Sequence, residues 1–169
     1  MKTILLLDII TAMILFLTLT SLSIFKILPL KMYLWFLTGL FLGTIWECCH
    51  SLIPNFIFMK KNLDVNHMFL YTVAHSIWDG FILFLSAFIV IGLLKISISS
   101  AASLILILIF GLSFEVIIEL LFNGTVWTYN ENLKYNPVLF RISTVGFTLW
   151  PFLEWILAPI LFWTFINLM

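Results

Sequence analysis

The sequence predicts an all-α integral membrane protein, a bundle of about five transmembrane helices forming a single domain over residues 1–169. Two features lead to this fold class. Hydrophobic residues make up 63% of the chain and charged residues only 9%, whereas an ordinary soluble domain has about 25% charged residues. The hydrophobic residues also form runs long enough to cross a bilayer, which takes about 20 residues. A soluble fold of this length could not bury so much apolar surface.

The apolar runs follow one another with polar separators. The first run follows directly on Lys2 and is longer than the core of a signal peptide; because no small-residue cleavage site follows it, we expect a retained helix. Pro29 precedes the second run, Lys95 ends the third, and the polar stretch 123–144 separates the fourth from the fifth. The predicted spans are residues 3–25, 32–58, 67–94, 98–122 and 145–168.

Composition also excludes several function classes. The net charge is zero and the chain has no basic run, so we expect no nucleic-acid partner. Cys48 and Cys49 are adjacent inside an apolar run, which argues against a disulfide framework. Soluble enzymes and disordered tails are excluded by the apolar content.

An odd number of spans places the two ends of the chain on opposite faces of the membrane. Five basic residues then share the N-terminal face: Lys2, Lys60, Lys61, Lys134 and Arg141. Three share the other face: Lys26, Lys31 and Lys95. The positive-inside rule therefore predicts a cytoplasmic N-terminus.

The acidic residues are distributed differently from the basic ones, because most of them lie inside the predicted spans. Six of the eight do so, together with two histidines: Asp8, Glu47, Asp79, Glu115, Glu119, Glu154, His50 and His75. No Lys or Arg lies at their depth, so these acids must be protonated, hydrated, hydrogen-bonded to each other or bound to a cation. Ionisable residues within a membrane are functional candidates by default.

Counted from the N-terminal face, every one of these acids falls in the same half of the bilayer. This pattern predicts a single polar pocket open toward that face. Independent helix-end acids near the headgroups are the alternative. Spacing favours convergence, because four pairs share a helix face at i,i+3 or i,i+4: Glu47/His50, His75/Asp79, Glu115/Glu119 and Trp150/Glu154.

Tryptophan recurs beside the acids, at Trp46, Trp78 and Trp155. Aromatic residues could line the pocket, but tryptophan is also ordinary at membrane interfaces. For Trp35, Trp155 and Trp163, an interfacial belt is an equally good interpretation.

Three chemistries fit such a pocket. Histidines and carboxylates on neighbouring helices can hold a metal, and Glu47-x-x-His50 is half of a di-iron motif. Intramembrane carboxylates also relay protons or cations in transporters, although the far half of this chain offers only Ser, Thr and Tyr. The third is acid catalysis on an apolar lipid, in which a neutral carboxylic acid protonates an alkene or epoxide and aromatic faces stabilise the cation.

Motifs in the last third of the chain add to the third interpretation. Gly124-Thr-Val-Trp127-Thr-Tyr129-Asn130, followed by Trp150-Pro151-Phe-Leu-Glu154-Trp155, resembles the membrane domain of carotenoid (lycopene) cyclases over residues 111–160. By position, the resemblance makes Glu119 the helix acid and Glu154 the second motif glutamate. Leu153 occupies the place of the family's first glutamate.

Separately, Ile45-Trp46-Glu47 is similar to the Trp-Glu of small integral-membrane terpene cyclases. Both resemblances imply non-redox cyclisation or isomerisation of isoprenoids, without a metal or nucleotide cofactor. The carotenoid cyclases usually assemble two such units, and this chain shows one.

The stretch 123–144 has two interpretations. Asn123-Gly124 is a turn dipeptide, and the following Trp and Tyr residues could anchor the stretch at the interface. Alternatively it is a lid over the pocket, because it lies on the pocket's face.

The sequence thus predicts a membrane-embedded isoprenoid or sterol-like cyclase or isomerase without cofactors. Its partners would be membrane lipid and an apolar lipid substrate, with homo- or hetero-oligomers left open. A small proton, cation or solute transporter, or a membrane component without catalysis, is the alternative, and a metal-binding enzyme the third. Predicted catalytic residues are Glu154, Glu119, Glu47 and Asp79. Predicted substrate-binding residues are His50, His75, Glu115, Trp46, Trp78, Trp127, Tyr129 and Trp150.

Glu154 is the residue for which the sequence predicts the most specific role, that of proton donor or cation stabiliser. It lies about nine residues into the fifth span and shares a helix face with Trp150. The sequence places no basic partner beside it, so we expect it to be a neutral acid.

Overall fold

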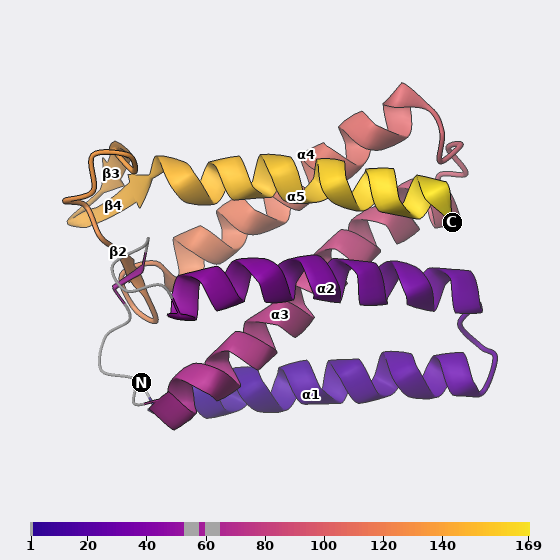
Figure 1. Ribbon diagram of the computed structural model, residues 1–169, viewed down its shortest axis with the longest axis horizontal. Helices are drawn as coiled ribbons and strands as arrows, with labels where there is room; N and C mark the ends of the chain where they lie inside the picture. The colour runs from indigo at the N-terminus through magenta and orange to yellow at the C-terminus, as the bar shows by residue number, and fades with distance from the viewer. Residues whose placement is uncertain (1, 53–57, 60–64) are drawn as a thin grey trace.

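The computed structural model describes residues 2–52, 58–59 and 65–169, and five long helices dominate it (Figure 1). Each contains a segment long and apolar enough to cross a membrane. A π-helical turn, η1 (Phe88–Leu93), continues the third helix. The helices are α1 (Lys2–Ile24), α2 (Leu30–Leu52), α3 (Val65–Ala87), α4 (Ala101–Phe122) and α5 (Leu149–Leu168). The predicted all-α bundle of about five helices is therefore confirmed.

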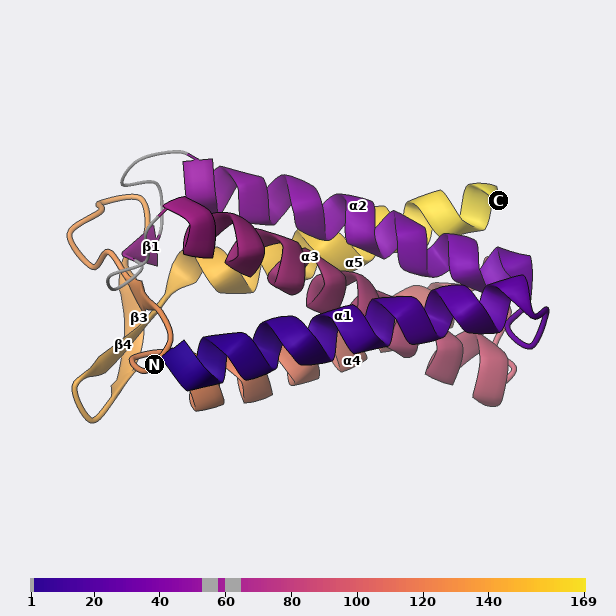
Figure 2. The same cartoon turned by 90° about the horizontal axis from the view of Figure 1, so that it is seen from below.

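Four short strands lie at the end of the bundle that carries the N-terminus, and the C-terminus lies at the opposite end (Figures 1 and 2). β1 (Phe58–Met59) pairs antiparallel with β2 (Thr128–Tyr129). β3 (Val138–Ile142) and β4 (Val145–Thr148) form an antiparallel hairpin. We refer to this end as the strand end.

The strands correct two predicted helix boundaries. The predicted second span ran to Phe58, which instead lies in β1, and residues 53–57 of that span lie outside the described residues. The predicted fifth span began at Val145, but 145–148 form β4, because pairing with β3 satisfies their backbone groups. The fourth helix begins at Ala101 rather than 98, since the Ser100 side chain caps it by accepting a hydrogen bond from the Ser103 N–H.

The hairpin is fastened to the helices by two amide side chains. Asn123, at the end of α4, donates through Nδ2 to the Gly146 carbonyl at 3.2 Å. The backbone N–H of Trp150 donates a hydrogen bond to Asn136 Oδ1 at 2.7 Å. The first turn of α5 and the last of α4 are thereby held to the same loop.

The closest helix packing is between α2 and α3, which share the most extensive contact in the bundle. Two glycines permit this approach. A methyl group added at Gly80 would lie 2.6 Å from the Leu40 backbone nitrogen, and one added at Gly39 would lie 2.9 Å from the Gly80 carbonyl oxygen. The backbones of the two helices are in direct contact here, so a larger residue in place of either glycine would displace a helix.

Trp35 and Trp163 lie far from the strand end, and the structure treats them differently. Trp35 is buried among core residues such as Phe36 and Phe84, so the belt interpretation is wrong for it. Trp163 donates to the Ile98 carbonyl at 2.8 Å and contacts the Ser103 hydroxyl at 2.9 Å. It thereby ties α5 to the connection before α4.

The glycine crossing generates a prediction. Gly80→Ala should lower the free energy of unfolding by about 1–3 kcal/mol, because the added methyl overpacks a backbone contact. Thermal unfolding of the detergent-solubilised protein measures this. Gly92→Ala is the matched control: its methyl would meet only the movable Phe88 ring, at 3.2 Å. Equal unfolding temperatures for the two variants would contradict the packing argument.

Candidate functional site

A cavity of about 460 Å³ lies toward the strand end, with walls from all five long helices and from the 123–144 stretch. All six acids predicted to lie in spans line it, as the depth pattern predicts: Asp8, Glu47, Asp79, Glu115, Glu119 and Glu154. Both histidines of the set line it too. Among the described residues that form its walls, none is Lys or Arg. The acids therefore share one site rather than lying separately at helix ends.

Most of the predicted site residues are in this wall. Of the twelve, eleven line the cavity, and Trp150 lies behind Glu154. Their tryptophans Trp46, Trp78 and Trp127 are joined by Trp155, for which a belt was the alternative. The remaining wall is largely aliphatic and aromatic, so the acids face an apolar space.

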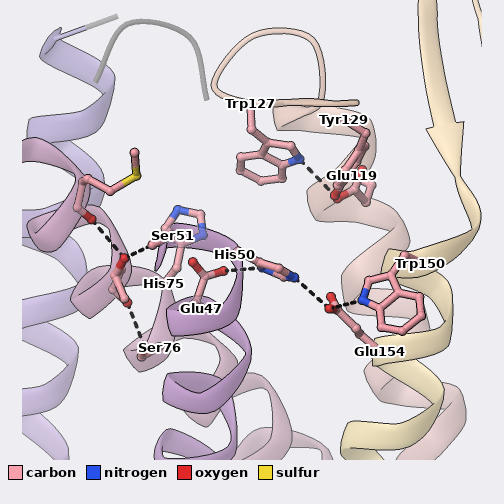
Figure 3. A network of polar contacts seen from close by, with 12 residues as sticks. Glu47, His50, Ser51, His75, Ser76, Glu119, Trp127, Tyr129, Trp150 and Glu154 are labelled. Carbon is pink, nitrogen blue, oxygen red and sulfur yellow. Dashed lines mark hydrogen bonds and ion pairs between the residues drawn. The ribbon is translucent and has the colours of Figure 1, made fainter. Parts of the chain in front are cut away.

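His50 occupies the centre of the polar network, between two carboxyl groups from different helices (Figure 3). Its Nε2 lies 2.7 Å from Glu154 Oε1, and its Nδ1 lies 3.7 Å from Glu47 Oε1. Glu154 Oε1 also accepts a hydrogen bond from Trp150 Nε1–H at 2.7 Å. The side chains of His50, Glu47 and Glu154 are all buried. The network joins the last turns of α2 to the first turns of α5.

This geometry corrects the expectation that Glu154 lacks a basic partner. The sequence has no Lys or Arg at the depth of Glu154, and the i,i+3 spacing predicts only that His50 shares a helix face with Glu47. The hydrogen bond to Glu154 joins residues 104 positions apart. Helical periodicity relates residues within one helix, so it cannot predict a contact between residues so far apart in the sequence.

Glu119 is held by the stretch that follows its own helix. Its Oε1 accepts hydrogen bonds from Trp127 Nε1–H, at 3.3 Å, and from the Tyr129 hydroxyl. Trp127 is 4% exposed and Tyr129 5%. Burial raises the pKa of the Tyr129 phenol above its usual value. The first part of the 123–144 stretch thus covers the cavity, as the lid interpretation predicts.

The second part of the same stretch behaves differently. Leu139, Phe140 and Ile142 of β3 are about half exposed, and Phe140 stacks on Phe147 of β4, with ring centroids 4.8 Å apart. An exposed apolar hairpin fits the interfacial-anchor interpretation. The two interpretations therefore describe two successive parts of the stretch.

A second histidine–carboxylate pair lies on the α1 and α3 side of the cavity. His75 Nε2 is 3.2 Å from Asp8 Oδ2, and Asp8 Oδ1 accepts a hydrogen bond from Trp78 Nε1–H at 2.9 Å. The His75 ring stacks on Tyr71 at a centroid distance of 3.9 Å. Asp8 and Tyr71 were not among the predicted site residues. Tyr71 lies four residues before His75, so the spacing rule applied to the other pairs would have found it.

The other two acids complete the wall. Asp79 is half-buried beside Gly43, where an added methyl would lie 3.0 Å from Asp79 Oδ2. Glu115 is buried one helical turn before Glu119. Within the described ranges, no group of three or more His, Cys, Asp or Glu side chains is arranged to hold a metal ion.

Comparison with known proteins returns no match for this chain among family models, curated proteins or solved structures. The likeness to membrane cyclases therefore rests on the short motifs alone.

The lid contact yields a pH prediction. A group whose pKa is raised on folding contributes stability below its unfolded pKa, about 10 for Tyr, and loses it as the pH rises through the folded value. Wild-type unfolding temperature should therefore fall more steeply than that of Tyr129→Phe as the pH is raised into the alkaline range. At neutral pH, the variant should be less stable by about 1 kcal/mol, for one lost hydrogen bond. Parallel pH curves would show that Tyr129 titrates as it does in water.

Proposed function

We propose that this protein is a membrane-embedded, non-redox cyclase or isomerase that acts on an isoprenoid or sterol-like lipid through intramembrane carboxylic acids. The observation that carries the proposal is the cavity, which combines six carboxyl groups with tryptophan, tyrosine and aliphatic walls. Its volume of about 460 Å³ lies within the range of small-molecule sites, about 300–1,000 Å³.

Glu154 is the proton donor in this proposal. A 2.7 Å hydrogen bond with His50 Nε2 and one donated by Trp150 Nε1–H hold its Oε1 in place. Among the described residues, no hydrogen bond engages Oε2, so that oxygen can carry the acidic proton. The O–H bond breaks as the π electrons of a substrate alkene form a new C–H bond. The resulting carbocation faces aromatic rings, which attract cations.

The substrate and the product of such a reaction have the same elemental composition. The cation rearranges or closes a ring and then loses a proton from a neighbouring carbon, so the product is an isomer of the substrate. Neither electrons nor a second substrate are needed. A largely apolar cavity also keeps water away from the cation.

Turnover of lipid probes tests the proposal. The full-length protein in nanodiscs would be incubated with acyclic sesquiterpenoid, diterpenoid and triterpenoid alcohols, hydrocarbons and terminal epoxides, and products analysed by mass spectrometry. We expect products of unchanged mass and altered retention. Glu154→Gln should lower turnover by about 10²–10⁴-fold, the usual contribution of general acid catalysis, with its unfolding temperature retained.

Glu131→Gln is the matched control, because Glu131 pairs with Arg141 outside the cavity and its turnover should stay at the wild-type level. Full activity in Glu154→Gln would remove this residue from the chemistry. Proton flux in liposomes without lipid turnover would favour the transporter alternative, and a metal ion lost in Glu154→Gln would favour the metal enzyme.

We propose in addition that the chain is a multi-pass membrane protein with a cytoplasmic N-terminus. The support is the excess of lysine and arginine assigned to that face. The cavity would then lie in the cytoplasmic half of the bilayer. A C-terminal reporter that is active only outside the cytoplasm should give signal, whereas signal from a cytoplasm-specific reporter would reverse the orientation.

A further inference from the structure

We infer that His75, positioned by Asp8, is the base that removes the proton at the end of the reaction. This inference rests on the proposed function and deepens it. A cyclase or isomerase needs a proton acceptor as well as a donor, and the cavity holds a second histidine–carboxylate pair, His75 and Asp8. Figure 3 shows His75 on a different helix from Glu154.

The contacts of His75 determine which of its ring nitrogens is available. Nε2 lies 3.2 Å from Asp8 Oδ2, and a carboxylate beside Nε2 favours the tautomer that carries the hydrogen on that nitrogen. Nδ1 then keeps its lone pair. Among the described residues, none makes a hydrogen bond to Nδ1. Trp78 Nε1–H holds the other Asp8 oxygen at 2.9 Å, so the carboxylate is itself fixed.

The imidazole ring is also held by aromatic neighbours. It stacks on Tyr71 with an interplanar angle of 21° and meets Trp127 nearly edge-on, at a centroid distance of 5.5 Å. Trp127 belongs to the lid and hydrogen-bonds to Glu119. The base therefore lies directly beneath the segment that covers the cavity.

The two cavity histidines differ in what they offer a ligand. Both ring nitrogens of His50 face carboxyl groups, and the His50 and Glu154 side chains are 5% and 7% exposed. The side chains of His75 and Asp8 are 16% and 24% exposed. His50 is thus suited to holding the acid, and His75 to accepting a proton and passing it to water.

The step balances as follows. A C–H bond next to the cationic carbon breaks, its electron pair becomes the new alkene, and the proton moves to His75 Nδ1. The imidazolium is then stabilised by the Asp8 carboxylate. Loss of one proton from His75 to water and gain of one by Glu154 return the enzyme to its starting state.

The positions of the proton donor Glu154 and the proton acceptor His75 also narrow the class of substrate. Glu154 lies on α5 and His75 on α3, so the proton enters and leaves on different walls. Such a separation suits a polyene whose cation migrates along the carbon skeleton before deprotonation. Ring closure is such a reaction, whereas a shift of one double bond to its neighbour would need donor and acceptor at nearly the same carbon.

Chemical labelling tests the free nitrogen without any substrate. Diethyl pyrocarbonate is small and apolar and acylates an imidazole lone pair. In the full-length protein in nanodiscs, peptide mass spectrometry should show His75 labelled at least about tenfold faster than His50, because the His75 side chain is the more exposed (16% against 5%) and both His50 ring nitrogens face carboxyl groups. Asp8→Asn should slow labelling of His75 at an unchanged unfolding temperature. Labelling of His50 before His75 would overturn the assignment.

Product analysis tests the step itself. His75→Phe keeps a ring between Tyr71 and Trp127 but has no lone pair, so isoprenoid turnover should fall by about 10²-fold or more. The remaining product should shift toward an alcohol, as water captures a cation that is not deprotonated. Tyr33→Phe is the matched control, because it removes a 2.9 Å contact between α1 and α2 at Thr20, outside the cavity, and should keep the wild-type product.

The two proposals fail in distinguishable ways. Unchanged turnover and product in His75→Phe would overturn the deprotonation step and leave the proposed function standing. Absence of isoprenoid turnover in wild type, with selective labelling of His75 intact, would overturn the proposed function and the step with it. If His75→Phe does not fold, the labelling of wild type and Asp8→Asn still decides whether Nδ1 is free.

Discussion

The arrangement of this protein depends on one constraint, which is that acidic side chains in an apolar chain must find partners within the protein. An ionised carboxylate in hydrocarbon is costly, and the described residues around these acids include no Lys or Arg. The contact between His50 and Glu154 meets the constraint where it is most severe, since both groups are buried. Because it joins the end of α2 to the beginning of α5, it also closes the cavity on one side. The same interaction therefore gives a buried carboxyl group a hydrogen-bond partner and positions two helices.

The lid and the helices around it follow from similar requirements. The Glu119 carboxyl group accepts hydrogen bonds from Trp127 and Tyr129, which lie just beyond its own helix. Pairing of β1 with β2 then holds the lid to the segment that precedes α3. The neighbouring hairpin leaves its apolar side chains outside. A single stretch of chain thus covers the cavity with one part and presents an apolar surface with the next.

Toward the other end of the bundle lie buried aromatic residues such as Trp35 and Phe36, and the close glycine crossing of α2 and α3 lies between them and the cavity. The two parts of the bundle are therefore stabilised differently. Apolar side-chain packing dominates away from the strand end, whereas the polar groups and their hydrogen bonds lie toward the strand end. The packing away from the cavity stabilises the helices. It thereby compensates for the helix–helix contacts that are missing around the cavity and its titratable groups.

Composition and residue spacing are enough to predict the helices, the half of the bundle that carries the acids, and the pairs that share a helix face. Those features depend on composition and on a period of 3.6 residues, which are local. Four features depend instead on contacts between segments: the hydrogen bond of His50 with Glu154, the pairing of Asp8 with His75, the burial of Trp35 and the strand at residues 145–148. Periodicity says which residues of one helix point the same way, but not which helix they point toward. The partners of a buried acid are set by helix packing, and that depends on contacts between residues far apart in the chain.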